Sequence, residues 1–315
     1  MARYIVGRLL AIVPVLFLVS LITFSLIYLV PGDPAIALAG DNATAEQVEA
    51  VREQLGLNDT FVVQYGRWVG GVVTGDLGDS LFSAQTVSEA LWKRVPVTLN
   101  LVLGALFIAL LVGVPAGIIA AVNRGRWIDR VMNLGAASGV SFPNYFIAML
   151  LIILFVHKLS WLPATGFVSF FENPWEWFTH LILPSAALAS GTMAVVTRQL
   201  RSSMVGVLEQ DYVRTANAKG LSRPKVILKH SLKNASLPVV TSIGTQVGLL
   251  VGGTAIIERL FSIPGLGALA IDAVLRRDLP VIQGIVLLTA VFVQLANLLT
   301  DAAYGFLNPK VRLAR

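Results

Sequence analysis

The sequence predicts an all-α, polytopic membrane protein with six transmembrane helices, and three observations carry this prediction. The 315 residues are 56% hydrophobic and only 13% charged, whereas soluble proteins carry about 25% charged residues. The apolar residues gather in runs of about 20 residues, long enough to cross a hydrocarbon core of about 30 Å. The Lys and Arg residues gather between these runs, which is typical of membrane topology and not of a nucleic-acid-binding face. We therefore expect the lipid bilayer, and no nucleic acid, around this chain.

The composition also excludes several kinds of chemistry. The chain has no cysteine, which removes disulfides, thiol catalysis and cysteine-ligated metal. Its histidines, His157, His180 and His230, lie far apart in the sequence, so we expect no metal site. In the polar segment 31–96, no pair of carboxylates has a spacing that suggests acid–base catalysis, and we expect no catalytic residue in the chain. The chain is therefore predicted not to be an enzyme.

The first span is predicted within residues 1–30. An apolar run extends from Leu9 to Val30 and is long enough to cross the membrane. The alternative is a cleaved signal peptide, whose hydrophobic region is shorter and is followed by a small-x-small cleavage site. Here the run ends in Pro31-Gly32-Asp33-Pro34 instead. This pattern favours an uncleaved N-terminal anchor helix.

Residues 31–96 form a polar segment that we expect to be a small extracytoplasmic region. Glu46–Gly56 has apolar residues at helical spacing and ends at a glycine, which predicts a helix. Gly75-Asp76-Leu77-Gly78 is a turn signal. Val87–Val95 is an amphipathic segment that leads into the next span. The charges of this region are interpreted as a solvated surface.

Five further spans are predicted within residues 97–306, which form the main transmembrane domain. The third is expected to be broken near Ser141-Phe142-Pro143-Asn144, because proline interrupts a helix. The connecting loop 157–179 is rich in aromatic residues, which settle at membrane–water boundaries. The predicted spans are Thr98–Val122, Met132–Val156, His180–Val196, Leu237–Ile257 and Pro280–Phe306.

The distribution of positive charge predicts the orientation. With the N-terminus inside, the cytoplasmic segments hold 16 of the 24 Lys and Arg residues, and eight of these lie between Arg198 and Lys233. Cytoplasmic loops carry the excess of Lys and Arg in membrane proteins. We therefore expect both termini in the cytoplasm, including the basic tail 307–315, in a multi-pass protein of the cytoplasmic (inner) membrane.

No Asp, Glu, Lys or Arg lies in the middle of a predicted span, which argues against a proton- or sodium-coupled transporter. Neutral polar residues remain, and they have two interpretations: they line a translocation path, or they form hydrogen bonds between packed helices. Gly244, Gly248, Gly252 and Gly253 make a small-residue stripe that favours close helix approach. The candidates for the path are Asn144, Thr241, Thr245, Gln246 and Gln283.

The polar stretch 198–236 is predicted to be a cytoplasmic loop of two short helices. Val205–Lys219 reads as a helix that ends at Gly220, which is well placed for the left-handed conformation. Ser222 and Pro224 fit the start of a second helix, and Pro238 opens the fifth span. Two roles stay open from the pattern alone: docking to a partner protein, and binding of lipid headgroups by basic helices.

The segment Asp211–Val239 (DYVRTANAKGLSRPKVILKHSLKNASLPV) resembles the cytoplasmic signature loop of bacterial ABC-importer permeases. The general motif of that family is E-A-A-x-x-x-G, followed downstream by I-x-L-P, and Ala216, Gly220 and Leu232 match it. The departures resemble the R-T-A-x-A-K-G and H-x-L-x-N version of the dipeptide/oligopeptide/nickel subfamily, in its B-type subunit. They are Arg214, Thr215, His230 and Lys233.

The resemblance covers nearly the whole chain, and its motifs are specific only when taken together. G-D-L-G alone would be weak. The other segments similar to this subfamily are Pro31–Pro34, Gly75–Gly78, Glu258–Gly267 (ERLFSIPGLG), Arg277–Pro280 and Gln283–Gly284.

The resemblance implies a type-1 ABC-importer permease fold and a translocation function. The chain would translocate di- and oligopeptides; nickel, glutathione or another small solute is the alternative. Its partners would be a second homologous permease, ABC ATPase subunits and an extracytoplasmic substrate-binding protein. ATP and Mg would bind the ATPase, since this chain has no G-x-x-x-x-G-K-[ST] loop, and no cofactor is expected on this chain.

The resemblance also assigns the site. The loop's first short helix would be the coupling helix that the ATPase moves. A non-coupled membrane scaffold or channel subunit is the other class that stays open, whereas a membrane-embedded enzyme would need clustered intramembrane Asp, His or Ser–His groups. The expected coupling residues are Glu209, Asp211, Tyr212, Arg214, Thr215, Ala216, Ala218, Lys219, Gly220 and Leu221.

Overall fold

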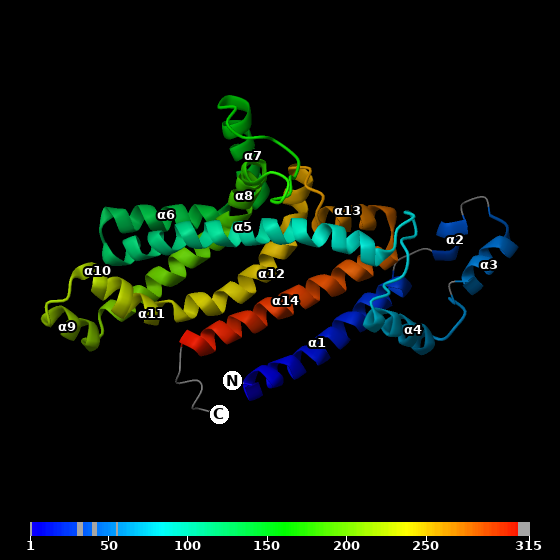
Figure 1. The fold of residues 1–315 in the computed structure, drawn as a ribbon, viewed down its shortest axis with the longest axis horizontal. Coiled ribbons are helices and arrows are strands. Elements are labelled where there is room, and N and C mark those ends of the chain that lie inside the picture. The colour runs from blue at the N-terminus through cyan, green and yellow to red at the C-terminus, as the bar shows by residue number, and fades with distance from the viewer. Residues whose placement is uncertain (1, 30–33, 40–42, 55, 308–315) are drawn as a thin grey trace. The chain divides into compact units, whose positions relative to one another are not determined.

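The structure is a computed structural model that describes residues 2–29, 34–39, 43–54 and 56–307. These residues are almost entirely helical (Figure 1), and one isolated β-bridge joins Asp79 and Thr86. The all-α fold class is thereby confirmed. The chain divides into two compact units, which we describe separately: a larger one within residues 1–7, 95–268 and 293–315, and a smaller one within residues 8–94 and 269–292.

The described helices follow one another without a sheet. Two short π-helical segments, η1 and η2, continue α-helices and contain no proline or glycine. In chain order the elements are α1 (Ala2–Leu29), α2 (Pro34–Ala39), α3 (Ala45–Gln54), α4 (Phe61–Thr74), α5 (Val87–Val122), α6 (Trp127–Ser141), α7 (Asn144–Leu151), η1 (Ile152–Lys158), α8 (Pro174–Leu208), α9 (Asp211–Ala218), α10 (Arg223–Lys225), η2 (Val226–Ser231), α11 (Leu232–Ala235), α12 (Leu237–Leu260), α13 (Leu266–Arg276) and α14 (Leu279–Leu307).

Among the described residues, five helices are long and apolar enough to cross a membrane, in α1, α5, α8, α12 and α14. A sixth span is obtained if α6 and the continuous helix α7–η1 count as one, and these two are bent by 106°. Phe142 is extended at the bend, with φ −88° and ψ 132°, because Pro143 disfavours a helical conformation in the residue before it. The predicted break in the third span is therefore confirmed.

Two spans begin earlier than the sequence predicted. α5 starts at Val87 and runs through Pro96 without a break, so the expected lead-in and the second span are one helix. α8 runs from Pro174 to Leu208 and contains the expected fourth span. Its N-terminus is capped by Asn173, whose side chain accepts hydrogen bonds from the backbone N–H groups of Trp175 and Glu176. Polar residues mark where a helix leaves the apolar layer, but the helix itself can continue beyond that point. Both predicted spans were therefore shorter than the helices that contain them.

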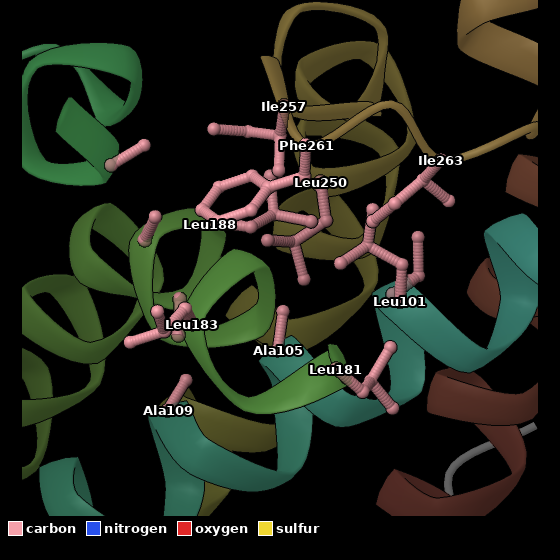
Figure 2. Packing of buried hydrophobic residues seen from close by; sticks show 14 of the residues in the cluster. Leu101, Ala105, Ala109, Leu181, Leu183, Leu188, Leu250, Ile257, Phe261 and Ile263 are labelled. Carbon is pink, nitrogen blue, oxygen red and sulfur yellow. The ribbon is translucent and has the colours of Figure 1, made fainter. Parts of the chain in front are cut away.

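Helix α8 is the centre of the larger unit and packs against α6, α7 and α12. Figure 2 shows side chains of α5, α8 and α12 meeting in one core, including Leu101, Leu188, Leu250 and Ile257. Glycines let α5 approach α8: a Cβ at Gly113 would lie 2.9 Å from the Met193 carbonyl oxygen. Close approach through small residues is how helices associate in membranes without a hydrophobic driving force.

The glycine stripe of the fifth span is only partly used inside this chain. A Cβ at Gly244 would lie 2.8 Å from Asn297 Oδ1, so α12 approaches α14 closely there. At Gly248 the nearest atoms, in Val293, would be 3.6 Å away, an ordinary contact. A Cβ at Gly252 would meet nothing within 4 Å. A Cβ at Gly253 would lie 3.2 Å from Leu188 Cδ1 of α8, a tight contact. The predicted close approach is therefore found at Gly244 and Gly253 and not along the whole stripe.

A buried carboxylate ends α12. The Glu258 side chain is 0% exposed; one oxygen accepts a hydrogen bond from Thr98 Oγ1 at 2.7 Å and the other from the Ala268 N–H at 2.8 Å. Thr98 Oγ1 also accepts from the Leu266 N–H at 2.8 Å. This network joins the start of the predicted second span to the link between α12 and α13. Sequence reasoning placed Glu258 just outside the fifth span and did not predict its burial.

In the smaller unit, Asp278 holds the loop before α5 against the link between α13 and α14. Its carboxylate accepts hydrogen bonds from Ser80 Oγ at 2.5 Å and from the Leu81 N–H at 3.2 Å. Helix α3 matches the helix predicted near residues 46–56, whereas α4 was not predicted. The Pro31-Gly32-Asp33 part of the first motif and the tail 308–315 lie outside the described residues.

Candidate functional site

The candidate site is built around α9, which follows α8 after a sharp change of direction. The sequence predicted one helix from Val205 to Lys219; the structure instead ends α8 at Leu208 and begins α9 at Asp211. Gln210 between them is extended, with φ −73° and ψ 148°. The available signal was Asp211, because an acidic residue in the first turn stabilises a helix N-terminus. With neither glycine nor proline at this point, the break was missed.

One face of α9 is buried against its own loop. Val213 and Ala216 are 1% and 6% exposed, and they pack with Val226 and with the partly buried Val207, Leu208 and Leu221. Burial of these small apolar groups holds α9 against η2 and the end of α8. Ala216 and Leu221, two of the ten predicted coupling residues, therefore shape the loop from inside.

The other eight predicted coupling residues are exposed. Asp211 and Arg214 form an ion pair at 3.3 Å across one turn, with side chains 95% and 73% exposed, so the pair contributes little to stability. Thr215 Oγ1 donates a hydrogen bond to the Asp211 carbonyl at 2.9 Å. These exposed residues form one polar surface, which we call the α9 face: Glu209, Asp211, Tyr212, Arg214, Thr215, Ala218, Lys219 and Gly220.

The turn after α9 has the predicted geometry. Gly220 has φ +76°, a left-handed conformation that costs other L-residues about 1–2 kcal/mol. Ser222 is the N-cap residue of α10 with Pro224 in its first turn, as expected, although its side chain makes no capping hydrogen bond. The short helices α10, η2 and α11 then lead into α12. The left-handed glycine and the second helix start are confirmed.

Two ion pairs tie the α5–α6 turn to α8 and to its junction with α9. Asp129 binds Arg201 through two hydrogen bonds, of 2.5 Å from Nε and 2.6 Å from a terminal nitrogen, and its side chain is 5% exposed. Asp129 also accepts from the Gly125 N–H at 2.9 Å. Arg124 forms a second, exposed ion pair with Glu209.

Sequence reasoning treated these arginines only as topology signals and missed the pairs. Asp129 was the available signal, as the one acid that follows closely on Arg124 and Arg126. A third contact closes the loop on itself: Asn234 Nδ2 donates to the Tyr212 hydroxyl at 2.9 Å. These contacts therefore join α9 and its junction with α8 to the α5–α6 turn and to the segment that opens α12.

The predicted path residues divide into different environments. Asn144, at the start of α7, accepts a hydrogen bond from Ser190 Oγ at 3.2 Å, and Gln246 of α12 accepts from Thr192 Oγ1 at 3.2 Å. These bonds link α7 and α12 to α8, which is the interhelical role that the sequence left open. Thr241 and Thr245 are exposed.

Gln283 lies in the smaller unit, where it is 4% exposed. Its Nε2 has no hydrogen-bond partner among the described residues.

Comparisons with known proteins match the whole chain. A family model described as "Binding-protein-dependent transport system inner membrane component" matches residues 113–313, and a model for the N-terminal part of such membrane components matches residues 1–102. The glutathione transport system permease protein GsiC of Escherichia coli (strain K12) is 44% identical over 99% of both chains. A putative peptide transport system permease protein of Brucella abortus (strain 2308) is 42% identical over 99% of both chains. With its five or six membrane-spanning helices and its loop of short helices, this chain belongs to the family of binding-protein-dependent transport system inner membrane components, the permease subunits of ABC importers.

Proposed function

We propose that this chain carries small peptides across the cytoplasmic membrane and that a separate ATPase drives it through the α9 face. The observation that carries the proposal is the division of α9 into a buried face, Val213 and Ala216, and an exposed polar face. A helix held in this way is a rigid projection whose outer residues are free to contact another protein. We further propose a second, related permease and an extracytoplasmic substrate-binding protein as partners.

The proposed coupling is a shift between two conformations. A partner changes such an equilibrium only through different binding free energies for the two states. Closure of the ATPase around the α9 face supplies that difference. The Asp129–Arg201 and Arg124–Glu209 pairs and the α10–α11 segment pass the displacement to α5, α8 and α12 as movements of packed helices.

The orientation follows from the same proposal. The α9 face must lie on the side of ATP, which is the cytoplasm, and the excess of Lys and Arg in the segments assigned to that side agrees with it. Both termini are then cytoplasmic, and the segment 31–96 faces the other side of the membrane. ATP and Mg bind the ATPase chains in this proposal.

The substrate class is tested by uptake into cells. The relatives bear names that specify glutathione and peptide transport, and glutathione is itself a small peptide. In a strain deleted for this gene, we expect reduced uptake of radiolabelled di- and oligopeptides, restored by a plasmid copy. An effect on glutathione alone would establish the alternative substrate. Unchanged uptake of peptides and of glutathione would contradict the proposal.

The coupling proposal is tested by replacing Gly220 with valine. Because Gly220 has φ +76°, a β-branched residue there favours a different turn by about 1–2 kcal/mol, which is roughly a five- to thirtyfold change in population. We expect normal membrane insertion and a loss of similar size in substrate-stimulated ATP hydrolysis by the reconstituted complex. Gly206→Val is the control, because a Cβ at Gly206 of α8 would meet nothing within 4 Å and its φ is not positive. Equal stimulation in both variants would exclude α9 as the coupling element.

A further inference from the structure

Helix α4 has two apolar faces, and only one of them is covered. The covered face packs its aromatic rings on the second half of α1 (Figure 1): the Phe24 ring centroid lies 5.5 Å from Phe61, 5.6 Å from Tyr65 and 5.4 Å from Trp68. On the same side, the buried Gln64 donates hydrogen bonds to the Leu57 and Asp59 carbonyl oxygens at 3.1 and 2.7 Å. This face needs no further partner.

The opposite face is apolar and exposed. Val62, Val63 and Val73 are 76%, 50% and 80% exposed, and Gly66 and Gly70 lie between them on the same side of the helix. Arg67 is the one charged residue of α4. It sits at the edge of this face and pairs with Asp59 at 2.5 Å. A helix that faced water on this side would carry polar residues there.

Contacts with α1 set the depth of α4 relative to the first span. The Tyr65 hydroxyl shares a hydrogen bond of 2.8 Å with Ser20 Oγ, and its ring lies 6.3 Å from that of Phe17. Both partners belong to the stretch Gly7–Ser25 that is apolar enough to span a membrane. Since an α-helix rises 1.5 Å per residue, Ser20 lies about 13 Å along α1 from its end at Leu29. Tyr65 is therefore at the level of the hydrocarbon. Phe61 lies closer to the end of α1, because its ring centroid is 5.5 Å from that of Tyr28.

We propose that α4 lies in the outer leaflet of the bilayer, with Val62, Val63 and Val73 against lipid acyl chains, and not in the aqueous extracytoplasmic region. The hydrogen bond between Tyr65 and Ser20 places α4 beside the membrane-spanning part of α1, so the surroundings of its exposed face at this depth are apolar. Elsewhere on α1, at about the level of Ser20, Leu18 and Ile22 are 56% and 63% exposed, so the membrane-spanning helix itself presents apolar side chains at this depth. The assignment of α4 to the outer leaflet rests on the orientation proposed above. The contact of α4 with lipid does not depend on that orientation.

Aromatic residues near helix ends of the smaller unit agree with this placement. Tyr28 lies near the end of α1 and the 66% exposed Trp92 near the start of α5, and Tyr and Trp settle at the headgroup boundary. Arg67, at the edge of the valine face, can extend its guanidinium toward the headgroups while its stem stays in the apolar layer. The segment 31–96 is thus divided into an aqueous part and a membrane-embedded helix.

The chain has no cysteine, so a single substitution gives this chain one labelling site. Nitroxide labels at Val62→Cys and Val73→Cys, in the complete complex reconstituted in lipid vesicles, report collisions with oxygen, which concentrates in lipid, and with a water-soluble nickel chelate. Leu10→Cys on α1, where the side chain is 66% exposed, is the lipid reference. Ser83→Cys in the exposed loop before α5 is the water reference.

We expect an oxygen-to-nickel collision ratio at Val62 and Val73 that is close to the Leu10 value and severalfold above the Ser83 value. A ratio like that of Ser83 would place α4 in water and overturn the proposal. Low collision rates with both reagents would overturn it too, by showing that a protein helix covers Gly66 and Gly70. Retained substrate-stimulated ATP hydrolysis in each labelled complex shows that the label has not unfolded the chain. Each of these outcomes leaves the coupling role of α9 untouched, so the two proposals fail separately.

Discussion

Replacing Arg201 with alanine is expected to lower the free energy of unfolding by about 3 kcal/mol, because the substitution leaves the buried Asp129 carboxylate without its cation. Asp129 is 5% exposed and receives two short hydrogen bonds from Arg201. Asp129 also accepts hydrogen bonds from the Gly125 N–H at 2.9 Å and from Asn133 Nδ2 at 2.7 Å, but these donors carry no positive charge to neutralise the carboxylate. Titration of the purified chain with SDS in mixed micelles measures the change.

The chain offers a matched control in Arg124→Ala. That arginine pairs with Glu209, but both side chains are more than half exposed, and such pairs are worth less than about 1 kcal/mol. The double variant Asp129→Asn with Arg201→Met removes both charges and keeps an acceptor for the Gly125 N–H, so it should recover most of the lost stability. If Arg201→Ala costs no more than Arg124→Ala, the buried pair does not hold α6 to α8.

Substitution of Gly267 by alanine is expected to destabilise the packing of the start of α13 on α12 by about 1–3 kcal/mol or more through overpacking. A Cβ there would lie 2.5 Å from Ala255 Cα and 2.6 Å from Ala255 N, and these are backbone atoms that cannot rotate away. The strain would also displace the N–H groups of Leu266 and Ala268 from Thr98 and Glu258. The amount of folded chain recovered from membranes and the SDS titration both report the loss.

Gly252→Ala on α12 is the control for this prediction. A Cβ at Gly252 would meet nothing within 4 Å, and alanine stabilises a helix by about 1 kcal/mol relative to glycine. We expect this variant to equal or exceed the wild type in stability. Equal stability of the Gly252 and Gly267 variants would contradict the close approach of the first turn of α13 to α12.

The features that the sequence predicted well are those that depend on one or a few neighbouring residues. Gly220 takes a left-handed φ and Pro143 breaks the third span, because glycine and proline change the backbone wherever they occur. The apolar runs likewise predicted the spans, since the free energy gained by moving apolar side chains out of water adds up along the chain. The break at Gln210 was missed because the side chain there does not itself require an extended backbone.

The sequence by itself determined that this is a helical membrane protein, about how often it crosses the bilayer, and where the loop 198–236 turns. Only the tertiary structure decided which loop residues are buried, that Arg201 meets Asp129, that Glu258 is enclosed, and how deep α4 lies on α1. Ser20 and Tyr65, or Asp129 and Arg201, meet because helices far apart in the sequence pack together. Such contacts depend on the shapes of both surfaces at once, and no local pattern of either segment contains that information.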